Sequence, residues 1–131
     1  DLIFEIEVIK VLPPKYKQMD SLQLKLAMTD KSFKIIDIRN KKEIEFSGKI
    51  PGSIIMTAFD INGNFIPNFL QSYQEKVGPN HKVVFVSKNG SISSILANGF
   101  TEQLQQDNIY NLKGGIEGLK KINLEFEDFK K

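Results

Sequence analysis

Residues 83–100 place a strand, a short loop and a helix directly after one another, and this order limits what the chain can fold into. The run Val-Val-Phe-Val is continuously apolar, as in strands that are buried on both faces of a parallel sheet. The loop Ser-Lys-Asn-Gly follows at once, and apolar residues then recur at helical spacing. Such a loop gathers backbone N–H groups at the start of a helix, where an anion or a reactive side chain can sit.

The same alternation of strands and helices runs along most of the chain. Strands are predicted at residues 3–9, 33–38, 53–56, 83–86 and 109–112. Helices are predicted over residues 22–28, 41–46 and 114–122, after Asn68, and after the loop that follows residue 86. Strands that alternate with helices in this way form βαβ units. We therefore predict an α/β fold, a single domain with a central, mostly parallel β-sheet flanked by helices on both faces.

Some side chains are expected to start helices and others to fill the core. Asp20 and Asn68 are expected to cap helices. The helix after Asn68 is expected to bury Leu70, Tyr73 and Val77. The helix after the loop is expected to bury Ile92, Ile95, Leu96, Phe100 and Leu104. Around the Asn-Gly turn at 62–63, an exposed apolar patch for a partner is predicted from Phe59, Phe65 and Phe69.

Charge and composition exclude several classes of function. The net charge is +2 and Arg39 is the only arginine among 131 residues, which argues against binding of nucleic acid. The absence of cysteine excludes disulfides, zinc–thiolate sites and cysteine catalysis. We predict that the protein binds no metal and no cofactor. We also predict no membrane insertion, because the longest apolar runs have only strand length. Since the sequence begins with Asp1 rather than Met, we interpret it as a processed or trimmed product and expect an exported or periplasmic protein, with the cytoplasm as the alternative.

The candidate site lies where predicted strands end. Ligands bind open α/β sheets beyond the carboxyl ends of the strands, and residues 37–39, 87–93 and 113–115 occupy such positions. We call residues 87–93 the site loop. Its backbone N–H groups and serine hydroxyls, together with that of Ser94, are predicted to face an anion. The predicted ligand-binding residues are Ser87, Lys88, Asn89, Gly90, Ser91, Ile92 and Ser93. The alternative is a plain strand–helix turn that Gly90 permits and a serine caps.

Two charged residues after the second predicted strand are expected to support the site loop. Asp37 is expected to accept hydrogen bonds at the strand end, and Arg39 to pair with a carboxylate such as Glu43. Residues 114–118 (G-G-I-E-G) lack the first glycine of a dinucleotide-binding motif, because that position is Lys113. We interpret this segment as a tight turn that allows close packing.

Short motifs at residues 35–39, 48–53, 84–90, 98–100, 109–112 and 114–116 form an ordered set, and this set resembles the motifs of rhodanese-like domains. Residues 35–39 with Glu43 resemble the family's I-D-V-R-x-x-x-E, and residues 48–53 (G-K-I-P-G-S) resemble its G-H-I-P-G-A. Residues 84–90 stand where the family has V-x-Y-C-x-x-G. The family's ending, G-F followed by V-Y-N-L-x-G-G-I, is matched by residues 98–100, 109–112 and 114–116. The resemblance covers residues 20–122 and implies a rhodanese-like domain there, with residues 1–19 as an N-terminal strand and extension and residues 123–131 as a C-terminal tail.

The chain departs from this family at the residues that carry its chemistry. Rhodanese-like enzymes hold the transferred sulfur as a persulfide on a cysteine, and that position is Ser87 here. A serine needs an adjacent base, and the only histidine, His81, lies six strand residues, or roughly 20 Å, away. The family's second basic loop position is Ile92, its usual histidine is Lys49, and its final tryptophan is Leu119. We therefore expect no catalytic residue.

The resulting interpretation is a rhodanese-like domain without sulfurtransferase activity, which binds a small anion or a protein partner at the site loop. One alternative is a thiosulfate or persulfide sulfurtransferase whose native cysteine has been replaced by Ser87, although this replacement would not account for Ile92. Another alternative is a structural interaction module with an empty loop, which binds its partner around residues 59–69.

Overall fold

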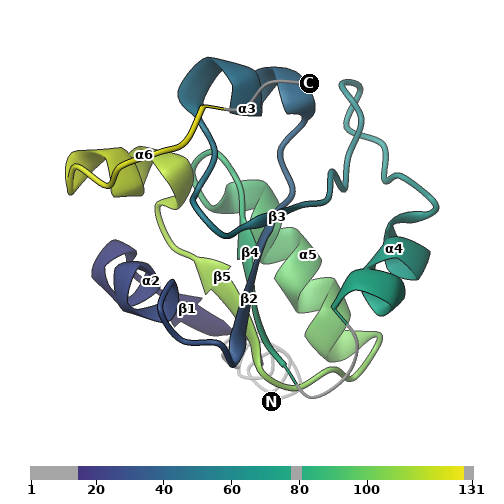
Figure 1. Cartoon of the computed structure of the whole chain (residues 1–131). Helices are drawn as coiled ribbons and strands as arrows, with labels where there is room; N and C mark the ends of the chain where they lie inside the picture. Colours follow the sequence, from purple (N-terminus) through teal and green to yellow (C-terminus); the bar gives the residue numbers. More distant parts are fainter. Residues whose placement is uncertain (1–14, 78–80, 129–131) are drawn as a thin grey trace, which may run out of the picture.

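The computed structural model describes residues 15–77 and 81–128, which form one parallel sheet with helices on both faces (Figure 1). The strands are β1 (Lys17–Met19), β2 (Phe33–Asp37), β3 (Ile54–Ile55), β4 (Lys82–Val86) and β5 (Ile109–Leu112), in the order β1-β5-β4-β2-β3. The helices are α2 (Ser21–Ala27), α3 (Lys41–Ser47), α4 (Phe69–Lys76), α5 (Ser91–Glu102) and α6 (Gly115–Lys121). The predicted α/β fold is confirmed. The strand predicted at residues 3–9 lies outside the described residues.

The apolar run of β4 is explained by its place at the centre of the sheet. Val83 and Phe85 face one apolar core, and Val84 and Val86 face the other. Helices α4 and α5 cover the first face, while α2 and α6 cover the second (Figure 1). Because successive side chains of a strand point to opposite faces, a strand covered on both sides must be apolar throughout.

Side chains cap the starts of α2 and α3, whereas α4 lacks the cap that was predicted for it. Asp20 Oδ1 accepts a hydrogen bond from Gln23 N at 2.8 Å and caps α2, as predicted. Asn40 caps α3 in the same way, through a 2.9 Å hydrogen bond from Glu43 N. Asn68 precedes α4, but its side chain makes no capping hydrogen bond, so that prediction is wrong.

The buried face of α4 lies one residue earlier than predicted. Phe69, Tyr73 and Val77 are buried at a spacing of four residues, whereas Leu70 is 37% exposed. Residues four apart lie on one side of a helix, so burial of Phe69 turns Leu70 outward. Phe69 is therefore a core residue and does not belong to the predicted exposed patch, while Phe65 remains 40% exposed.

The buried face of α5 also differs from the prediction. Leu96 and Phe100 are buried as expected, but Ile92, Ile95 and Leu104 are 38%, 66% and 44% exposed. The positions beside the sheet are taken by Ser93, Ala97 and Thr101. These residues are small, and the two hydroxyls find hydrogen-bond partners inside the protein, so the larger isoleucines are left on the outside.

Segments on either side of residues 20–122 join the same fold. β1 pairs with β5, with Lys17 opposite Tyr110, and forms an edge strand that the sequence analysis did not predict. Beyond α6, Lys49 and Glu127 exchange two backbone hydrogen bonds of 2.8 Å, and Phe126 packs against the second core. None of the helices in the described ranges has the length and apolar character needed to cross a bilayer.

Candidate functional site

Backbone packing between two loops fixes the shape of the site loop. Gly90 has φ +93°, and a Cβ there would lie 2.9 Å from the carbonyl oxygen of Leu112. Gly115 has φ +57°, and a Cβ there would collide with the carbonyl oxygen of Ser87. That same oxygen accepts a hydrogen bond from Ile116 N at 3.0 Å. The prediction that the glycines after β5 permit close packing is therefore confirmed.

Ser87 lies at the bottom of the site loop, directly after β4, and is 1% exposed. Its Oγ accepts hydrogen bonds from Gly90 N at 3.2 Å and from Ser93 N at 3.3 Å. Its Oγ also lies 2.8 Å from Ser93 Oγ. Ser87 thus holds the loop through two of the backbone N–H groups that were predicted to face an anion.

A chain of hydrogen bonds connects Ser87 to the edge of the sheet. Ser93 Oγ donates to Asn111 Oδ1 at 2.5 Å, and Asn111 Nδ2 donates to Gln18 Oε1 at 3.0 Å. We call Ser87, Ser93, Asn111 and Gln18 the serine–asparagine network. A hydroxyl has a single hydrogen, so Ser93, which donates to Asn111, must accept from Ser87. The Ser87 proton therefore points to another hydroxyl, and within residues 15–77 and 81–128 neither an imidazole nor a carboxylate is a hydrogen-bond partner of Ser87 Oγ.

Only some of the predicted donors of the site loop remain available to a ligand. The Ser94 hydroxyl donates to Ser91 O at 2.6 Å, and Ser91 N donates to Asn89 Oδ1 at 3.0 Å. Gly90, rather than a serine, stands at the N-cap of α5, so the expected serine cap is wrong. In residues 15–77 and 81–128, no acceptor is found for the backbone N–H groups of Lys88, Asn89 or Ile92. Lys88 and Asn89 precede α5 and Ile92 lies in its first turn, where the helix dipole favours negative charge.

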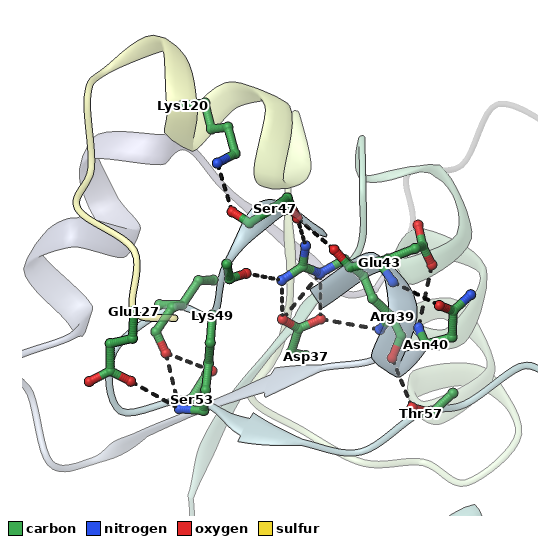
Figure 2. A network of polar contacts seen from close by, with 12 residues as sticks. Asp37, Arg39, Asn40, Glu43, Ser47, Lys49, Ser53, Thr57, Lys120 and Glu127 are labelled. Atoms are coloured by element: carbon green, nitrogen blue, oxygen red, sulfur yellow. Dashed lines mark hydrogen bonds and ion pairs between the residues drawn. The ribbon is translucent and has the colours of Figure 1, made fainter. Parts of the chain in front are cut away.

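Asp37 and Arg39 form a buried ion pair beside the site loop (Figure 2). Arg39 Nη2 donates to Asp37 Oδ2 at 2.7 Å, and Arg39 Nε donates to Oδ1 at 2.9 Å. Arg39 is 4% exposed and Asp37 is 0% exposed, so both residues are nearly inaccessible to solvent. The expected pairing of Arg39 with Glu43 is wrong, because Glu43 Oε1 instead accepts from Asn40 N in the cap of α3. Asp37, two residues before Arg39 at the end of β2, binds the guanidinium in a bidentate geometry.

The remaining donors of Arg39 hold neighbouring segments in place. Arg39 Nη1 donates to Ser47 Oγ at 2.5 Å, and Nη2 also donates to Gly48 O at 2.8 Å (Figure 2). The Arg39 carbonyl accepts from Thr57 Oγ1 at 2.8 Å. Arg39 therefore connects β2, the end of α3 and the segment after β3. Its charge is largely matched by Asp37 and is not free to hold a ligand.

A cleft of about 300 Å³ opens over the site loop. We call it the site cleft. Its floor includes Ser87, Lys88, Asn89, Ser91 and Ile92, and its walls are Ile38, Arg39, Asn40, Glu43, Phe59, Asp60, Ile61 and Gly63. Of the predicted site residues, Gly90, Ser93 and Asp37 do not line it. The cleft brings one exposed ammonium, from Lys88, together with two carboxylates, from Glu43 and Asp60.

Sequence reasoning missed two parts of this site. Asn111 was read only as part of a strand, although an amide inside an apolar run signals a buried polar partner. The wall at residues 59–63 was read as a turn, and no local pattern shows that it lies opposite the site loop. Asp60 shapes that wall by accepting hydrogen bonds from the amides of Asn62 and Asn64, each at 2.9 Å.

Neither an acid–base pair nor a metal-binding cluster accompanies Ser87 in the described residues. His81 precedes β4 and Ser87 follows it, so the two residues lie at opposite ends of that strand. Within the described ranges, no group of three histidine, aspartate or glutamate side chains is placed to bind a metal ion. The arrangement can offer backbone amides and one lysine to a ligand, but the part of the chain that the structure describes supplies Ser87 with no base that would remove its proton.

Comparisons with known proteins agree with the fold. The sequence model of the rhodanese-like domain matches residues 20–122. The rhodanese-like domain of the Anabaena sp. protein Alr3790 is 19% identical, with a TM-score of 0.67 over 90% of this chain and 81% of that one. Rv0390 from M. tuberculosis is 18% identical, with a TM-score of 0.70 over 87% of this chain and 99% of that one. A rhodanese-like domain protein from Staphylococcus aureus is 18% identical, with a TM-score of 0.62 over 85% and 98%. No curated protein sequence gives a significant match.

Proposed function

The chain belongs to the rhodanese-like domain family, and from that premise we propose that it lacks sulfurtransferase activity and binds a small anion, or an acidic group of a partner protein, at the site loop. The observation that carries the proposal is the hydrogen bonding of Ser87. Its hydroxyl accepts from two loop amides and donates to Ser93, so it serves as a fixed part of the loop. A thiolate can attack sulfur without a base, whereas a hydroxyl cannot.

Support for anion binding comes from the donors that remain at the mouth of the site loop. The amides of Lys88, Asn89 and Ile92 lie at the start of α5, and the Lys88 ammonium lines the same cleft. The carboxylates of Glu43 and Asp60 work against an anion, although both already accept hydrogen bonds from backbone amides. We therefore expect weak binding, with dissociation constants on the order of millimolar.

An NMR titration with sulfate, phosphate and thiosulfate tests the binding. We expect saturable shifts confined to the backbone amides of residues 88–94. Lys88→Gln is expected to weaken binding by about 2- to 5-fold, because an exposed charge contributes about 0.3–1 kcal/mol. Lys76→Gln is the matched control, because Lys76 is an exposed lysine of α4 that does not line the site cleft, and it is expected to leave binding unchanged. Unchanged spectra at tens of millimolar anion would refute anion binding and favour the empty-loop module.

Restoring a thiol tests the absence of sulfurtransferase activity separately. We expect Ser87→Cys to give at most feeble transfer from thiosulfate to cyanide, because Lys88 is the only cation of the site loop and Ile92 stands where a second one would hold the anionic donor. Ile92 is 38% exposed on the cleft, so arginine can be accommodated there. The double variant Ser87→Cys/Ile92→Arg is expected to exceed the single variant clearly. Robust activity in Ser87→Cys alone would favour an enzyme whose native residue 87 is cysteine.

A further inference from the structure

Residues of α4, α5 and the segment before α4 line an apolar groove. These two helices cover the face of the sheet opposite α2 and α6 (Figure 1). The groove has a volume of about 310 Å³, and its walls include Phe65, Leu70, Ile95, Gly99 and Leu104. None of its lining residues in the described ranges is charged. Ile95 is 66% exposed, and Leu104 and Phe65 are 44% and 40% exposed. Apolar side chains that are exposed next to one another are typical of sites where a partner or another segment docks.

We propose that the occupant of the apolar groove is residues 2–9 of the same chain. Their sequence is Leu-Ile-Phe-Glu-Ile-Glu-Val-Ile, in which Phe4, Ile6 and Val8 alternate with Glu5 and Glu7. In an extended segment this alternation gives one apolar side and one acidic side. The apolar side suits an uncharged groove, and the acidic side is left to water.

The start of the described chain lies at the correct end of the groove. Lys15 Nζ is 3.9 Å from Glu102 Oε2, at the last residue of α5. Glu102 follows Ile95 by seven residues, or about two helical turns, so both lie on the same side of α5. Tyr16 packs against the apolar core that α4 and α5 cover. The chain therefore enters the sheet on the face that carries the groove, near the C-terminal end of α5.

The segment is also long enough to reach. Residues 10–14 separate the proposed occupant from Lys15, and five residues span at most about 17 Å. Seven residues of helix rise about 10 Å, so Ile95 is within reach of residue 9. Eight extended residues cover about 26 Å, which is sufficient for the length of α5.

A spin label on the full chain tests the docking, because the protein has no cysteine and one introduced thiol is unique. Glu7→Cys puts the label on the acidic side of the segment. We expect loss of the amide signals of Ile95, Gly99 and Leu104 through paramagnetic broadening. The same label at Lys121→Cys, on α6 across the sheet, is expected to leave those signals intact.

Substitutions in the labelled chain show whether the apolar side of the segment is responsible. Phe4→Ser/Ile6→Ser is expected to restore the broadened signals, whereas Glu5→Gln is expected to leave them broadened. Absence of broadening in the Glu7→Cys chain would overturn the proposal and leave the groove for a separate partner. Broadening that occurs only between labelled and unlabelled molecules, and that grows with concentration, would overturn it in favour of a second copy. Neither result depends on anion binding at the site loop.

Discussion

Removal of the Ser93 hydroxyl is expected to destabilise the fold far more than its position in a serine-rich helix suggests. Ser93 is fully buried and links Ser87 to Asn111 through hydrogen bonds of 2.8 and 2.5 Å. Ser93→Ala removes both bonds and leaves two buried polar partners with one bond fewer each. A net loss of about 1 kcal/mol per bond, together with the cost of partners left unsatisfied, gives about 2–4 kcal/mol.

A neighbouring serine on the same helix provides the control. Ser94 is partly exposed and donates only to Ser91 O, so Ser94→Ala is expected to change the free energy of unfolding by no more than about 0.5 kcal/mol. Both variants replace serine by alanine in α5, so the gain in helix propensity cancels in the comparison. Urea unfolding measures the difference. At an m-value of about 2 kcal/mol/M, Ser93→Ala lowers the midpoint by about 1–2 M.

A second substitution identifies the source of the loss. In Ser93→Ala/Asn111→Leu, the unsatisfied amide is replaced by an apolar side chain of similar size. The double variant is therefore expected to cost less than the sum of the two single variants. Equal unfolding midpoints for Ser93→Ala and Ser94→Ala would refute the reasoning, since the serine–asparagine network would then contribute no net stability.

Three further predictions concern other parts of the fold. Burial raises the pKa of Tyr73 to about 12. The contribution of this group to the free energy of unfolding should therefore be constant below about pH 10 and should fall by up to about 2–3 kcal/mol between pH 10 and 12. Tyr73→Phe should lose that decline when urea unfolding is measured across this pH range. Gly115→Ala should lower the free energy of unfolding by about 3–5 kcal/mol, because its Cβ would collide with the site loop. Gly52 also has a positive φ but lies in open space, so Gly52→Ala should cost only about 1 kcal/mol in the same urea unfolding measurement. Arg39→Met should cost about 3–5 kcal/mol in thermal or urea unfolding because it leaves Asp37 buried without its cation, and a loss below 1 kcal/mol would show that the pair is not needed for stability.

Local sequence patterns were sufficient to predict the central strands and most helices. The apolar run of β4 could be read directly, because a strand covered on both faces leaves no polar positions. Asp20 could be identified as the start of α2 because its cap involves only a residue three positions away. By contrast, β1 has only three residues and is stabilised by pairing with β5, about 90 residues later. No local pattern contains that pairing.

The orientation of α5 shows why the site itself was harder to predict. Its sequence offers isoleucines on one side and small or polar residues on another, and hydrophobicity alone favours burial of the isoleucines. Asn111, on β5, provides the acceptor that makes burial of Ser93 favourable. The choice of buried face thus depends on a residue 18 positions away. The same limit explains Arg39, for which Glu43 was the expected partner although the structure pairs it with Asp37.

The forces that hold the site loop differ from those that would make it react. Its shape depends on glycine at residues 90 and 115 and on backbone hydrogen bonds from Ile116 and Glu117, none of which requires a thiol at residue 87. Ser87 adds hydrogen bonds to two loop amides and thereby fits the same scaffold. A chain can consequently retain the fold and most of the motifs while the side chains at positions 87 and 92, which would supply a nucleophile and a positive charge, change. Membership of the family therefore predicts the loop and its amides, and the reaction has to be argued from the residues at positions 87 and 92.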